Sequence, residues 1–169
     1  MQQTIKLQSL GIGELRTYTY ATLFTVGNIV LPQLCHLIPQ GGLMILPIYF
    51  FTLIGAYKYG LTVGLLTAVL SPLTNSLLFG MPVVGMLPAI LIKSVLLALG
   101  AALTARHFNK VSILLLAAVV LFYQVVGSVA EWAVTGTLTA ALQDFRLSVP
   151  GMLLQVFGGY VVLTKIIRK

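Results

Sequence analysis

Long apolar runs alternate with short polar stretches along the whole chain. A segment that crosses a bilayer must satisfy its backbone hydrogen bonds internally, so charges and glycine or proline clusters collect in the connections. Cutting the runs at those positions predicts an all-α membrane protein, a bundle of six transmembrane helices forming one domain over residues 1–169. Pro32, Pro47 and Pro72 lie within the first three helices, which leaves kinked or re-entrant forms of these open. The approximate bounds of the six helices are 17–38, 43–57, 59–78, 82–104, 111–134 and 147–166.

Composition supports this assignment. Hydrophobic residues make up 59% of the chain and charged residues 8%, whereas about 25% of the residues in a soluble domain are charged. Six helices of about 20 residues each need about 120 residues, so no appended catalytic or nucleotide-binding domain fits. The polar N-terminus lacks the pattern of a cleaved signal peptide, and the first helix is expected to act as the insertion signal. The single cysteine, Cys35, excludes an internal disulfide and any multi-cysteine metal site.

The basic residues are distributed unevenly between the two sides of the predicted bundle. Short cytoplasmic loops are enriched in lysine and arginine. If the N-terminus is cytoplasmic, only Arg146 lies in an outer loop and Lys93 lies within a helix. This asymmetry predicts that both termini are cytoplasmic, in a bacterial or archaeal inner membrane. It also accounts for the net charge of +7, which is therefore no evidence for nucleic-acid binding. The basic residues predicted on the inner side are Lys6, Arg16, Lys58, Arg106, Lys110, Lys165, Arg168 and Lys169.

Lys93 is the strongest candidate for a functional residue. It lies 11 residues past Pro82, roughly 16 Å along a helix, which places it near the middle of the membrane. Charged side chains inside a membrane segment are costly and mark functional sites or internal pairs. Glu131, near the outer end of the fifth helix and beside Trp132, is the second candidate. Two interpretations remain open: both residues contact a ligand, or Lys93 forms a structural pair with Glu131.

Three further polar residues fall at a similar depth. Gln124 lies two helical turns below Glu131, Tyr123 is its neighbour, and Gln155 is about two turns inside the sixth helix. These positions predict a polar pocket that opens outward between the fourth, fifth and sixth helices. Each glutamine taken alone is more often a hydrogen bond between helices than a ligand contact.

The outer connections offer additional candidates. The loop over residues 32–42 carries no formal charge and is a candidate lid bearing His36, although a packing or capping role is favoured for the pair Cys35-His36. The pair supplies too few ligands for a metal site. Asn75, with Ser76 and the Gly80-Met81-Pro82 turn, is assigned to the next outer connection and is a further candidate. Gly60, Gly64 and Ala68 form a small-residue stripe suited to close helix packing or to partner docking.

Catalytic motifs are missing from the sequence. There is no HExxH, no GxSxG, no glycine-rich phosphate loop and no paired-carboxylate arrangement. We therefore expect neither enzymatic activity nor a cofactor. A small intramembrane enzyme that uses His36 or Lys93 is the least favoured interpretation.

The segment LPQLCHLIPQGGLMILPIYFFTLIGAYKYGLTVGLLTAVLSPLTNSLLFGMP, about a third of the chain, resembles a known family. It is similar to the substrate-binding subunits, or S components, of energy-coupling factor (ECF) vitamin transporters. The resemblance lies in the leucine-proline and histidine of the first loop, the early proline of the second helix, the tyrosine-glycine that opens the third, and the S-P…S-L-L-x-G-M-P run that enters the fourth.

The resemblance implies a subunit that binds a vitamin or related micronutrient from outside and has no energy source of its own. It would associate with a transmembrane coupling subunit and two cytoplasmic ATPases, and topple in the membrane to release the substrate. The family's coupling patch is alanine-x-x-x-alanine in the first helix, matched here only by Ala21 and Thr25. Relatives often carry an acidic residue near the position of Lys93, so a lysine there suggests a ligand with an anionic group.

A structural scaffold of the rod-shape type is the alternative function, since such proteins can share this length and helix number. The two interpretations differ in what they predict for Lys93→Ala. For a binding protein, the sequence predicts weaker ligand binding without unfolding. Loss of the protein from the membrane, reversed by Glu131→Gln, would instead identify Lys93 as a structural partner.

Overall fold

The computed structural model describes residues 2–4, 8–35, 37 and 44–166. It is helical over most of its length, with one short two-stranded sheet that joins β1 (Gln2–Thr4) to β2 (Lys110–Ser112) in antiparallel register. The all-α prediction therefore holds apart from this pair. The helices are α1 (Leu15–Cys35), the 3₁₀ turn η1 (Pro47–Tyr49), α3 (Phe50–Tyr59), α4 (Leu61–Phe79), α5 (Leu87–Phe108), α6 (Ile113–Thr135), α7 (Leu138–Leu147), α8 (Val149–Leu153), η2 (Leu154–Gly158), α9 (Gly159–Val161) and η3 (Val162–Ile166).

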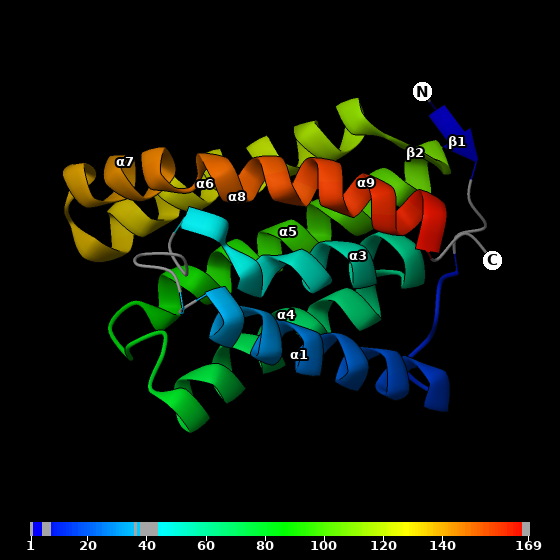
Figure 1. The fold of residues 1–169 in the computed structure, drawn as a ribbon, viewed down its shortest axis with the longest axis horizontal. Helices are drawn as coiled ribbons and strands as arrows, with labels where there is room; N and C mark the ends of the chain where they lie inside the picture. The colour runs from blue at the N-terminus through cyan, green and yellow to red at the C-terminus, as the bar shows by residue number, and fades with distance from the viewer. Residues whose placement is uncertain (1, 5–7, 36, 38–43, 167–169) are drawn as a thin grey trace.

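The two ends of the bundle differ in what they contain. The two chain termini and the β1–β2 pair lie at one end, and α7 lies at the other (Figure 1). At the first end the backbone N–H of Gln8 donates to the carbonyl of Lys58, and the Tyr57 hydroxyl donates to the carbonyl of Lys110 at 2.7 Å. These bonds hold the N-terminal segment and β2 against the end of α3.

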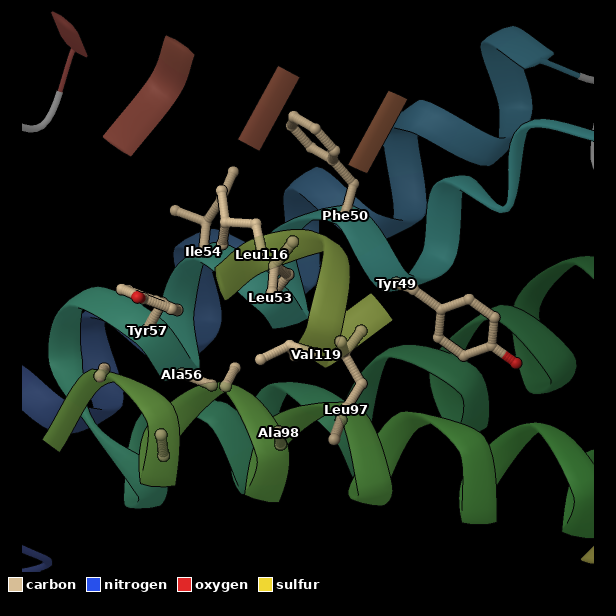
Figure 2. Packing of buried hydrophobic residues seen from close by; sticks show 14 of the residues in the cluster. Tyr49, Phe50, Leu53, Ile54, Ala56, Tyr57, Leu97, Ala98, Leu116 and Val119 are labelled. Atoms are coloured by element: carbon tan, nitrogen blue, oxygen red, sulfur yellow. The ribbon is translucent and has the colours of Figure 1, made fainter. Parts of the chain in front are cut away.

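Helix α3 is the centre of the bundle. All of its residues except Phe51 are buried, and a helix that is apolar on every side belongs in a core. Leu53 and Ile54 pack against side chains of α5 and α6, among them Leu97 and Leu116 (Figure 2). Ten residues span only about 15 Å, so α3 is short for a membrane crossing and is shielded by its longer neighbours.

Close contact between α3 and α4 depends on the predicted small-residue stripe. A Cβ atom added at Gly64 would collide with the Cβ of Ala56 in α3, and it would come within 2.8 Å of the Ala56 Cα. Ala68 is fully buried one turn further on. The packing interpretation of the stripe is therefore confirmed for these two residues, which leave no room for a partner at this position.

Several of the described helices are long and apolar enough to cross a membrane. Helices α4, α5 and α6 meet that condition, and the stretch 141–147 with 149–165 forms a fourth candidate that bends by 53°. Helix α1 has 21 residues but carries many threonine, tyrosine and amide side chains. The chain is thus an α-helical protein with three or four such segments among the described residues, and six crossings remain a prediction.

The boundaries differ from the predicted ones in informative ways. Helices α1 and α4 continue without a break through Pro32 and Pro72. The fourth helix begins at Leu87 rather than near residue 82, because Gly80 ends α4 in a left-handed conformation and residues 83–87 form turns. Pro88 then lies in the first turn of α5, where its missing N–H costs nothing. Lys93 is consequently only about 9 Å from the start of its helix.

Asn75 is part of α4 and not of an outer connection. Its side-chain amide donates to the carbonyls of Asn28 at 2.9 Å and Ser71 at 3.1 Å. The Asn28 side chain in turn donates to Thr52 and Ser71 and accepts from the Phe51 N–H. This buried network joins α1, α3 and α4, so the structure places Asn75 in helix packing, away from Lys93.

Candidate functional site

Lys93 forms two ion pairs with carboxylates from two other helices. Its Nζ lies 2.5 Å from Oε2 of Glu131 in α6 and 2.6 Å from Oδ2 of Asp144 in α7. The three side chains are 5%, 8% and 18% exposed, respectively. We call Lys93, Glu131 and Asp144 the charge cluster. The pair of Lys93 with Glu131 was one of the two interpretations left open by the sequence, and the structure adds a second carboxylate to it.

A glycine makes room for the lysine. Gly127 lies one turn before Glu131 on α6, and a Cβ atom added there would collide with Cγ of Lys93 and lie 3.3 Å from its Cε. The stem of Lys93 therefore crosses directly over the α6 backbone to reach the carboxylates. A side chain at this position of α6 would displace the ammonium group.

The charge cluster lines a cavity of about 250 Å³ at the α7 end of the bundle. Its lining combines polar and apolar side chains, and α5 supplies both kinds, since Lys93 lies one turn after Ala89 and Ile90. Thr135 joins the charge cluster in the polar part of the lining, and its hydroxyl donates to the carbonyl of Glu131. The apolar part comes from the η1 region and the start of α5 and consists of Leu46, Ile48, Tyr49, Met86, Ala89 and Ile90.

Tyr49 connects the cavity to a second buried group. Its ring points away from Leu53 and the core around it (Figure 2), and it packs 5.4 Å from the ring of Tyr123. The Tyr123 hydroxyl donates to Oε1 of Gln155 at 3.0 Å. The predicted residues Tyr123 and Gln155 therefore lie behind the cavity wall, with Tyr123 in contact with Tyr49.

Gln124 touches the charge cluster directly. Its Nε2 lies 3.5 Å from Oδ2 of Asp144, which is the outer limit of a hydrogen bond. The side chain is fully buried, and its Oε1 has no hydrogen-bond partner among the described residues. Nε2 of Gln155 is likewise buried without a partner in that part of the chain. Buried polar atoms of this kind call for a ligand or a water molecule, so both glutamines are incompletely satisfied by the protein itself.

The structure thus brings together most, but not all, of the predicted site residues. Lys93 and Glu131 line the cavity, Gln124 contacts the charge cluster at Asp144 without lining the cavity, and Tyr123 and Gln155 lie behind Tyr49. Asn75 does not reach it, and His36, with most of the predicted lid, lies outside the described residues. Ala21 and Thr25 are only 2% and 8% exposed, so they pack inside the bundle and offer no exposed docking patch. The aliphatic side chains that α1 exposes instead are Leu15, Leu23, Val26, Val30 and Leu34.

Sequence reasoning missed Asp144 and Tyr49. Asp144 is one of only three acidic residues in the chain, and that rarity was a usable signal. The sequence predicts a polar connection for the segment that contains Asp144. In the structure this segment is the helix α7, which brings Asp144 to the cavity. Tyr49 resembles an ordinary core aromatic in the sequence, and only its position beside the cavity distinguishes it.

The site has the properties of a binding pocket. Among the described residues, no three histidine, cysteine or acidic side chains are grouped as metal ligands. Comparison with known proteins finds no homologue. No family model, no curated protein and no solved structure matches this chain. What the arrangement offers is a partly apolar cavity with a few convergent charged groups, which is the usual form of a small-molecule site.

Proposed function

We propose that the protein is the substrate-binding S component of an ECF-type importer. In this role it captures a small vitamin-like molecule from the outer side and delivers it to the cytoplasm together with a transmembrane coupling subunit and two cytoplasmic ATPases. The observation that carries the proposal is the cavity of about 250 Å³ with a buried charge cluster in its wall. The resemblance over residues 31–82 supports the choice of family.

The proposal includes six crossings, with α1, η1–α3, α4, α5, α6 and α8–η3 as the transmembrane segments. The basic residues Lys58, Arg106 and Lys110 belong to the end that holds both termini, whereas Lys93 and Arg146 belong to the α7 end. By the positive-inside rule the α7 end then faces outward. The cavity would open toward the side from which an importer takes its substrate.

The expectation of an anionic ligand loses its main support. Lys93 was the predicted partner of the anion, yet its ammonium group already contacts two carboxylates. An anion would have to separate these ion pairs to reach the ammonium group. We therefore retain the transport function and do not retain the anionic ligand.

Co-purification tests the transport proposal. An affinity-tagged copy, expressed in a cell that encodes an ECF module and extracted in mild detergent, is expected to bring down the coupling subunit and both ATPases in stoichiometric amounts. An unrelated six-span protein with the same tag controls for nonspecific recovery. Recovery of cell-shape proteins in place of the ECF subunits would contradict the proposal and favour the scaffold interpretation.

A further inference from the structure

We infer that the ligand of this cavity is a small organic cation, held through an ammonium or amidinium group between the carboxylates of Glu131 and Asp144. This inference rests on the proposed binding function and names the substrate class of the same site.

The formal charge of the cluster is negative. Lys93 supplies one positive charge, and Glu131 and Asp144 supply two negative charges, so the sum is −1. Arg146 is the nearest basic residue in the sequence, yet among the described residues the two carboxylates pair only with Lys93. An uncompensated charge away from water is costly. A ligand with one positive charge would bring the site to neutrality, whereas an anion would bring it to −2.

The free hydrogen-bonding atoms favour the same class of ligand. Oε1 of Glu131 and Oδ1 of Asp144 accept no hydrogen bond from the described residues. Against these two acceptors the charge cluster has one donor left, the third N–H of Lys93. A site with a surplus of acceptors is completed by a ligand that donates, as ammonium and amidinium groups do.

The apolar part of the lining favours an organic body over a hydrated inorganic ion. Tyr49, Leu46, Ile48 and Ile90 line the same cavity as the charge cluster. An engineered cavity of about 150 Å³ already accommodates benzene, so this larger cavity has room for one ring with an aminomethyl group. The Tyr49 ring also offers an aromatic face, to which a cation is attracted.

A panel of one-ring compounds matched in size tests the inference. The purified full-length protein in detergent is titrated with benzylammonium, benzyl alcohol and benzoate, and the dissociation constants are obtained from the shift in thermal unfolding temperature. We expect benzylammonium to bind at least about tenfold more tightly than benzoate, with benzyl alcohol between them. The same titration with sodium chloride is expected to give no comparable stabilisation.

Substitutions in the charge cluster test whether the preference for benzylammonium over benzoate arises at this cavity. Glu131→Gln makes the cluster formally neutral and is expected to reduce the preference for benzylammonium over benzoate about tenfold or more. Glu14→Gln is the matched control, because Glu14 is exposed at the opposite end of the fold and its substitution should leave the preference unchanged. Should Glu131→Gln not fold, Asp144→Asn makes the same change at the more exposed carboxylate.

Three results would overturn the inference. They are tighter binding of benzoate than of benzylammonium, stabilisation by sodium equal to that by benzylammonium, and no stabilisation by any compound of the panel. Tight binding of benzoate would leave the proposed transport function intact. Failure of the ECF subunits to co-purify would remove that function without affecting the charge preference measured here.

Discussion

Substitution of Lys93 by methionine is expected to lower the free energy of unfolding by about 3–5 kcal/mol, which is the usual cost of breaking a buried ion pair by removing one partner. Methionine fills much of the same volume, so the loss comes from the two carboxylates left without a cation. Denaturant titration in mixed micelles measures it. The sequence alone predicts that removal of Lys93 leaves the fold intact, and the ion pairs in the structure reverse that expectation.

Two matched variants make this result specific to the charge cluster. Arg106→Met removes a basic side chain from the exposed last turn of the same helix and should change stability by less than about 0.5 kcal/mol. The triple substitution Lys93→Met, Glu131→Gln and Asp144→Asn removes all three charges and should recover more than half of the loss. Equal stability of Lys93→Met and Arg106→Met would show that the ion pairs do not hold the helices together.

Substitution of Gly127 by alanine is expected to destabilise the protein by about 1–3 kcal/mol, the usual range for an overpacked contact. The added methyl group would occupy the space of the Lys93 stem and move the ammonium group away from Glu131 and Asp144. Thermal and denaturant unfolding measure the loss. Gly100→Ala on α5 is the control, because its new methyl group would meet mainly the ring of Phe122, which can shift.

A double-mutant cycle separates this contact from a general effect on α6. In a Lys93→Ala background the stem of Lys93 is gone, so Gly127→Ala should cost almost nothing there. The coupling energy of the cycle is then nearly the whole cost of the single substitution. Additive effects of the two substitutions would mean that Gly127 acts on something other than Lys93.

The helical segments were predictable because their apolar runs are long and are separated by charges and breakers. The run from residue 111 to residue 134, for example, matches α6 within two residues at its start and one at its end. Local turns were harder to predict. Gly80 and Pro88 shift the start of α5 by five residues, which changes the position of Lys93 along its helix. The pairing of β1 with β2 is a long-range contact with no periodic pattern in the sequence.

The candidate site was predictable in its charged core and not in its geometry. Lys93 and Glu131 are recognisable because a charged side chain inside an apolar run is costly, so it marks a functional site or an internal pair. Asp144 joins them only because the chain bends by 53° between α7 and the segment that follows, and no residue pattern encodes that angle directly. The small residues Ala21 and Thr25 suggested a helix contact, but spacing alone does not tell whether the contact is internal or with a partner.

Native mass spectrometry of the protein released from membranes tests the central claim, that the charge cluster and its cavity hold a small molecule. The account predicts a bound adduct in the natural sequence and in the Glu14→Gln control, with its occupancy lowered at least about tenfold in Glu131→Gln. Tandem fragmentation should then release a compound with an amine or amidine group. The same adduct at equal occupancy in Glu131→Gln, or no adduct in any of the three proteins, would contradict the account.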